Sequence, residues 1–217
     1  MPCAILTCIF AGAAIASARP ATDSLVFKRT YADGERLVYH GLMKMSGMDM
    51  TLDSIVKVAV RKKTLDAKPQ ISLVTTKYES TGPNVTPSEK PRDIVITVGA
   101  NSMPEDLELK KGDSDIYPWL LIGAMTADKA VEVGQEFPES WSSKGDIPMA
   151  IKGTGKVTAL DSVAKTASVT WTFSVSVGGT DVGKAVLKSV YDAANCRLES
   201  CEGTIMDGMC SISIKRQ

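Results

Sequence analysis

The sequence predicts a mainly β protein with a single antiparallel sheet, strongly curved into a half-barrel or open barrel and built from long hairpins. A two-sheet β-sandwich is the alternative. Two observations predict this class. Several segments alternate between apolar and polar residues, which is typical of antiparallel strands with one dry and one wet face. Turn sequences such as Asp207-Gly208 join neighbouring segments into hairpins.

The N-terminal segment of the 217-residue chain is typical of an export signal. Residues 4–18 are uncharged and are too short to cross a bilayer, which takes about 20 apolar residues. They end in Ala-Ser-Ala at 16–18, a pattern of small residues at which signal peptides are cut. We expect a signal peptide over 1–18, a single all-β domain over 19–217, and export to the periplasm or the cell exterior. After cleavage no integral membrane segment is expected.

The first long hairpin is expected over residues 37–60. Its apolar residues stand at odd positions before Ser46-Gly47 and at even positions after it, so a two-residue turn there puts both sets on one face. In this register the methionines form two facing pairs, Met45 with Met48 and Met43 with Met50. Two pairs of opposite charge support the register on the other face, Lys44 with Asp49 and His40 with Asp53.

The clearest strand is 167–177, in which apolar residues alternate with Ser and Thr. Residues 151–160 are expected to be its hairpin partner, with a turn near Asp161-Ser162. A first strand over 25–31 leads to a turn at 33–34. Further strands are expected over 70–78, 94–98, 130–134 and 184–192. One short helix is expected near 118–127, where Pro118 suits a first turn.

The last hairpin is expected to turn at residues 207–208. The turn brings two pairs together, Ile205 with Cys210 and Met206 with Met209. Cys201 then lies about four residues along the strand from the partner of Cys210, roughly 13 Å away. A disulfide needs Cα atoms within about 7 Å, so no bond between Cys201 and Cys210 is expected. Any bridge to Cys196 would need a bulge or a different turn.

Charge and motifs argue against enzymatic and nucleic-acid functions. Lys plus Arg and Asp plus Glu both number 25, so the chain has no basic footprint for nucleic acid. The nucleophile-elbow, zinc-protease and Cys-x-x-Cys patterns are absent. His40 is the only histidine, and Gly-Thr-Gly-Lys at 153–156 lacks the rest of a phosphate loop. The acidic residues of 105–115 are interpreted as a solvated loop. We expect no enzyme activity and no cofactor.

The methionines are the unusual feature of the sequence. Four of them occur within eight residues and share the predicted dry face. Three interpretations are open: the methionines fill a core, they line a site for an apolar small molecule or lipid, or they bind copper. Copper is considered because thioether ligands suit Cu(I). The candidate ligand-binding residues are these four and an aromatic residue of the predicted helix: Met43, Met45, Met48, Met50 and Trp119.

Two short motifs resemble those of poorly characterised exported bacterial all-β proteins. They are Asp33-Gly34-Glu35 after the first strand and Val133-Gly134-Gln135-Glu136-Phe137 before the C-terminal hairpins. The strand pattern is similar to that of the periplasmic lipoprotein carriers and related lipid-binding lipoproteins, which have half-barrel folds. The resemblance implies a non-enzymatic exported protein that binds an apolar ligand or lipid in the concave face of a curved sheet. Copper binding and a structural envelope role are the alternatives.

Overall fold

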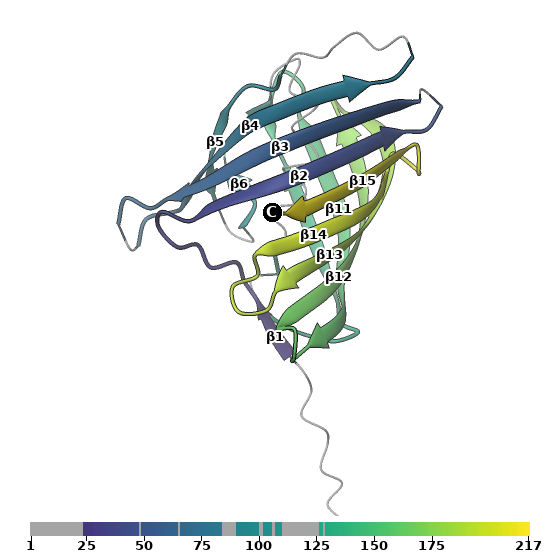
Figure 1. The fold of residues 1–217 in the computed structure, drawn as a ribbon. Helices are drawn as coiled ribbons and strands as arrows, with labels where there is room; N and C mark the ends of the chain where they lie inside the picture. The colour runs from purple at the N-terminus through teal and green to yellow at the C-terminus, as the bar shows by residue number, and fades with distance from the viewer. Residues whose placement is uncertain are drawn as a thin grey trace, which may run out of the picture.

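The computed structural model describes residues 24–47, 49–64, 66–83, 90–99, 102–105, 107–109, 126–127 and 129–217. These residues are mainly β and contain no α-helix, so the predicted β class is confirmed (Figure 1). Most strands belong to one antiparallel sheet of eleven strands, which we call the main sheet. Alternate residues point to opposite sides of a strand, which gives the main sheet a core-facing side and an outer side.

The main sheet has two halves. The first contains β2 (Arg36–Met45), β3 (Met50–Arg61), β4 (Gln70–Thr81), β5 (Ile94–Val98) and β6 (Pro104–Glu105). The second contains β9 (Glu136–Ser142), β11 (Met149–Asp161), β12 (Thr166–Val177), β13 (Thr180–Asp192), β14 (Leu198–Ile205) and β15 (Cys210–Arg216). The strand order is β6-β5-β4-β3-β2-β15-β14-β13-β12-β11-β9, so pairing of β15 with β2 joins the halves.

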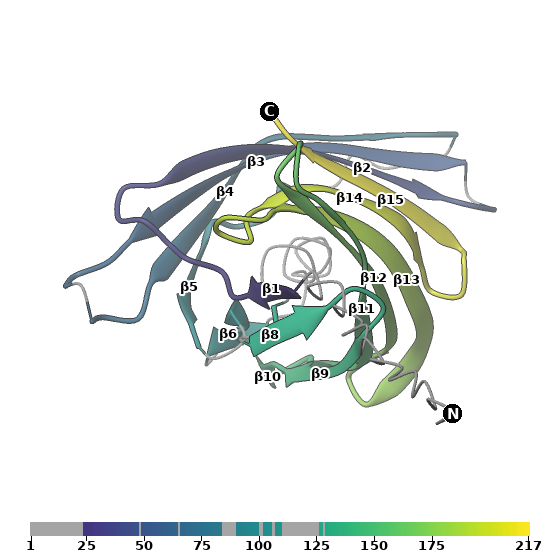
Figure 2. The same ribbon diagram turned by 90° about the horizontal axis from the view of Figure 1, so that it is seen from below.

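Two small sheets accompany the main sheet. β1 (Ser24–Phe27) pairs antiparallel with β8 (Lys129–Glu132), and β7 (Glu108–Leu109) pairs parallel with β10 (Lys144–Gly145). Figure 2 shows β1 and β8 on the inner side of the main sheet. They therefore form a second layer over its core-facing side.

The main sheet is open and is not strongly curled, so the prediction of a strongly curved half-barrel or open barrel was wrong in that respect. Its edge strands β6 and β9 do not pair with each other. Trp141 Nε1 of β9 donates to the carbonyl oxygen of Pro104 of β6 at 2.8 Å. The segments that follow these edge strands are joined by the small β7–β10 sheet, beside which Lys144 N donates to the carbonyl oxygen of Leu107 at 2.9 Å. Alternation and turn sequences indicate the hairpins, whereas the curl of the sheet depends on bulges and edge contacts.

The hairpins of the second half follow the prediction closely. β12 covers the predicted strand 167–177, and β11 is its hairpin partner. The turn at 207–208 gives the predicted register, with Ile205 opposite Cys210. In this register Cys201 lies opposite Ile214, and Cys196, Cys201 and Cys210 are free thiols.

Two other expectations had different outcomes. The predicted strand 25–31 is shorter, because the chain after Phe27 runs as an irregular connection to β2. The predicted helix near 118–127 lies outside the described residues except for Thr126 and Ala127, which are not helical. The second layer of β1 and β8 is also far smaller than the second sheet of the alternative sandwich.

Aromatic rings form the centre of the core. The ring of Phe27, on β1, lies close to three others by centroid distance: Tyr191 at 5.0 Å, Phe137 at 5.9 Å and Trp171 at 6.1 Å. Trp171 is fully buried and stacks on Phe173 at 5.5 Å. Its indole N–H donates to the hydroxyl of Tyr191 at 3.2 Å. These contacts fix β1 to the core-facing side of the main sheet.

Gly155 makes room for these rings. It pairs with Trp171 on one neighbouring strand and with Phe137 on the other. A Cβ atom at this position would lie 2.5 Å from a ring carbon of each. The Gly-Thr-Gly-Lys sequence at 153–156 is therefore part of strand β11, as predicted, and its second glycine serves aromatic packing.

An ion pair is buried in the connection between β1 and β2. Arg29 Nη2 donates to both carboxylate oxygens of Glu35, at 2.8 and 2.7 Å, and the side chains are only 5% and 12% exposed. The Arg29 guanidinium also lies over the ring of Tyr31, 4.5 Å from its centroid. A wider network of charged side chains joins this connection to β13, β14 and β15: Asp192, Arg197, Glu199 and Arg216.

Candidate functional site

Three of the four predicted methionines lie on the core-facing side of the β2–β3 hairpin. The connection has four residues, 46–49, instead of a two-residue turn, so Met45 pairs with Met50 and Met43 pairs with Leu52. The predicted register was therefore wrong by two residues. The predicted face was right, because a shift of two positions preserves the alternation of a strand. Two predicted ligand-binding residues lie outside the described part of the chain, Met48 and Trp119.

The β2–β3 and β14–β15 connections lie side by side at one end of the sheet (Figures 1 and 2). Sulfur-bearing side chains pack together there. Ser46 N donates to the carbonyl oxygen of Met209 at 2.7 Å and ties the two connections together. We call the following four residues the sulfur cluster: Met43, Met45, Met206 and Cys210. They form an apolar cluster, separate from the main core, with three further residues: Leu52, Tyr78 and Ile205.

The Cys210 thiol donates a hydrogen bond to the Met206 thioether, with Sγ and Sδ 3.8 Å apart. Cys210 also pairs in register with Met45 across β15 and β2. Sequence reasoning placed these residues on two separate hairpins and missed that the hairpins are neighbours. The only available signal was that Cys210 and Met45 each stand on the apolar face of their own hairpin.

The only histidine takes part in an ion cluster on the outer side of the sheet. His40 Nε2 lies 2.9 Å from Asp53 Oδ1, and Lys77 Nζ lies 3.0 Å from Asp53 Oδ2. Burial acts to raise the pKa of Asp53, but the hydrogen bonds from Lys77 and His40 outweigh it, so the pKa is lowered. The predicted His40–Asp53 contact is confirmed as a diagonal one, because His40 pairs with Ile55 and Asp53 with Leu42.

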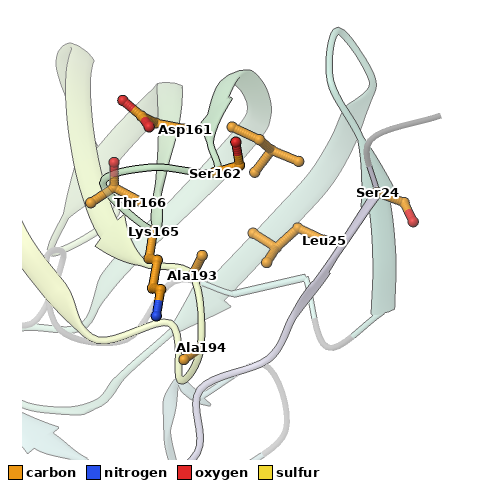
Figure 3. Close-up of a pocket in the computed structure, with 9 residues that line it drawn as sticks. Ser24, Leu25, Asp161, Ser162, Lys165, Thr166, Ala193 and Ala194 are labelled. Atoms are coloured by element: carbon orange, nitrogen blue, oxygen red, sulfur yellow. The ribbon is translucent and has the colours of Figure 1, made fainter. Parts of the chain in front are cut away.

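A pocket of about 550 Å³ opens at the end of the sheet near β1. It lies between β1, the turn that joins β11 to β12, and the turn that joins β13 to β14. Its lining residues are Ser24, Leu25, Leu160, Asp161, Ser162, Lys165, Thr166, Ala193 and Ala194. Figure 3 shows Leu25 pointing from β1 into the space, and the side chain of Lys165 reaching toward Ala193 and Ala194.

A second pocket, of about 500 Å³, is lined mainly by charged and polar residues. Its lining includes three consecutive basic residues at the end of β3, Arg61, Lys62 and Lys63. Both acidic residues of this pocket already have partners within the protein. Asp33 accepts a hydrogen bond from Lys62 N at 2.8 Å, and Glu35 pairs with Arg29. This pocket offers less apolar surface to a ligand than the pocket beside β1.

The predicted acidic loop is described only in part. Glu105 accepts from Lys68 Nζ at 2.6 and 2.7 Å, so a surface ion pair occupies this carboxylate. Three other acidic residues of the loop lie outside the described residues: Asp106, Asp113 and Asp115. In the part of the chain that is described, no group of three or more His, Cys, Asp or Glu side chains is placed to share a metal ion.

Comparisons with protein-family models, with curated proteins and with solved structures found no match for this chain. Among the described residues, no helix has the length and apolar character needed to cross a membrane. The candidate sites are therefore chosen from the geometry of this chain alone. They are the pocket beside β1 and the sulfur cluster.

Two of the three described thiols should be inert in the folded protein. Burial raises the pKa of Cys196 and of Cys201 to about 11. Since the thiolate is the reactive form, about 0.1% of each thiol is reactive at pH 8, and this fraction rises as the pH approaches 11. We expect a disulfide reagent at pH 8 to leave both residues unmodified, as measured by peptide mass spectrometry. Denatured protein should be modified fully, and rapid modification of Cys201 in folded protein would contradict the burial.

Proposed function

We propose that the protein is an exported, non-enzymatic binding protein whose ligand is an amphiphile with an apolar chain and an acidic head group. The observation that carries the proposal is the pocket beside β1. Its lining combines apolar side chains of the core with the ammonium group of Lys165. Its volume of about 550 Å³ falls among those of ligand pockets, which measure about 300–1,000 Å³.

The apolar wall of this pocket is an extension of the main core. Leu25 belongs to the core, and Leu160 packs against it while remaining half-buried. Ala193 and Ala194 add small apolar surfaces on the opposite side. A ligand chain placed here gains about 0.8 kcal/mol for each buried CH₂ group.

Lys165 supplies the charge that selects an acidic head group. It stands in the exposed turn after β11 and forms no ion pair among the described residues. Asp161, the acidic residue nearest in sequence, uses its Oδ1 atom to accept from the backbone N–H groups of Val163 and Ala164, at 2.9 and 2.8 Å. A bound carboxylate therefore meets one cation whose charge is not already paired within this turn.

The sequence of residues 4–18 supports export, because it combines an uncharged apolar stretch with a cleavage pattern at 16–18. An apolar ligand also suits an exported carrier, since amphiphiles need a protein to cross an aqueous compartment. Protein taken from the exported fraction, with a chain that begins at Arg19, is therefore the form to use for binding measurements.

The test is calorimetric titration with decanoate, dodecanoate and dodecanol. We expect dodecanoate to bind, and each added CH₂ group to strengthen binding about fourfold while the chain fits the pocket. Lys165→Met should weaken dodecanoate binding about tenfold, because a hydrogen bond to a charged group is lost. Binding of dodecanol should change little in this variant.

Lys188→Met is the matched control, because Lys188 is exposed on β13 and does not line the pocket. This variant should bind dodecanoate like the unchanged protein. Absence of binding at every chain length, or equal binding of dodecanoate by the unchanged protein and by Lys165→Met, would overturn the proposal.

A further inference from the structure

The sulfur cluster brings together residues from both halves of the main sheet. Cys210 of β15 pairs with Met45 of β2, and Met45 pairs in turn with Met50 of β3. Directly opposite residues on antiparallel strands have Cα atoms about 4.5–5.5 Å apart and side chains on the same face. Three sulfur-bearing side chains therefore form a row across three strands. Met206, beside the row, has its sulfur 3.8 Å from that of Cys210.

The 3.8 Å spacing of this thiol–thioether hydrogen bond is also the spacing of two sulfur ligands that share one metal ion. Two sulfur ligands about 2.3 Å from one ion lie about 3.8 Å apart at the tetrahedral angle. One thiolate with thioethers is a soft donor set, and soft ligands select Cu(I) over magnesium, calcium or manganese. Zinc sites use Cys, His or carboxylate ligands, and the described residues place no three of these together.

The surroundings of the cluster suit an ion that arrives from solvent. Cys210 and Met43 are buried, whereas Met45 and Met206 are half-buried. Met50, which lies beside the cluster, is also half-buried. Apolar neighbours surround the sulfurs and exclude water from one side. Methionine side chains are flexible, so small rotations bring a thioether to an ion held by the cysteine.

We propose that Cys210, Met206 and Met45 form a Cu(I) site at the junction of the two halves of the sheet. On binding, the Cys210 thiol releases its proton to solvent and its sulfur bonds to Cu(I), while the two thioethers donate lone pairs. The copper stays in the Cu(I) state, so no oxidant or reductant is consumed. This site differs from the methionine set predicted by sequence, because it takes its thiolate from the last hairpin.

The test uses Cu(I) and a coloured Cu(I) chelator as competitor, without oxygen. The starting protein is the full chain with Cys3 and Cys8 replaced by serine. Their thiols would also bind copper, and replacing them makes the result independent of whether residues 1–18 are removed. We expect one equivalent of Cu(I) to be retained, and X-ray absorption to show only sulfur neighbours at about 2.3 Å. Cys210→Ser should weaken retention about 100-fold, and Met206→Leu about tenfold.

Two variants serve as controls. Met209→Leu changes a methionine of the same turn that is 53% exposed and outside the cluster, so retention should stay within about twofold. Cys201→Ser removes a buried thiol of the main core and should also leave retention unchanged. Circular dichroism checks that each variant is folded. Equal losses in Met206→Leu and Met209→Leu, or copper retention by folded Cys210→Ser equal to that of the starting protein, would overturn the proposal.

Discussion

Trp171→Ala is expected to lower the free energy of unfolding by about 3–5 kcal/mol, the cost of deleting a large buried aromatic side chain. Trp171 is fully buried and its ring contacts those of Phe27, Phe137 and Phe173. Its neighbour in register on β11 is Gly155, which has no side chain to fill the space left. The substitution also removes the indole donor to the hydroxyl of Tyr191.

Urea denaturation followed by circular dichroism measures this loss. Trp171→Phe keeps a ring at the centre of the core and should be less destabilising. Trp141→Ala is the matched control, because Trp141 is half-buried at the edge strand β9 and donates to Pro104 O. A loss for Trp171→Ala no larger than that for Trp141→Ala would show that the aromatic group is not the centre of the core.

Glu35→Ala is expected to lower the free energy of unfolding by a similar amount, about 3–5 kcal/mol. Its carboxylate accepts two hydrogen bonds from Arg29, whose side chain is almost fully buried. Removing the carboxylate leaves a buried guanidinium without its main counter-charge, and desolvation of that charge then opposes folding. Glu35→Gln keeps a hydrogen-bond acceptor, so it should lower the free energy of unfolding by less than Glu35→Ala.

The surface pair of Lys68 and Glu105 provides the control. It has similar distances, but its side chains are 61% and 39% exposed. Exposed pairs contribute about 0–1 kcal/mol, so Glu105→Ala should be close to neutral. The measurement is again urea denaturation of both variants. Equal losses for Glu35→Ala and Glu105→Ala would mean that burial does not set the strength of the Arg29–Glu35 pair.

The strands were predictable because alternation is a local property of the chain. The dry face of 167–177 and the turn at 207–208 each depend on a few neighbouring residues, and both are confirmed. The hairpin around residues 46–47 shows the limit of this reasoning. Gly47 and Asp49 both have positive φ and belong to the four-residue connection 46–49. Compared with a two-residue turn, this connection shifts the pairing of β2 with β3 by two positions. Alternation does not distinguish registers that differ by two.

Contacts between distant segments were not predictable. Nothing local to β15 indicates that it pairs with β2, so the meeting of Cys210 with Met45 was missed. The same limit hid the Arg29 network, because its members are ordinary charged residues in sequence. The pocket beside β1 was missed too, since it is assembled from three separate connections.

The pairing of β15 with β2 has a consequence for the synthesis of the chain. β2 is made before its partner β15, and the other strands of the main sheet are made in between. Until then one edge of β2 exposes backbone groups that invite pairing with other chains. The nascent protein therefore carries an aggregation-prone edge until β15 is made, and a chaperone that shields β2 during this interval would protect the chain.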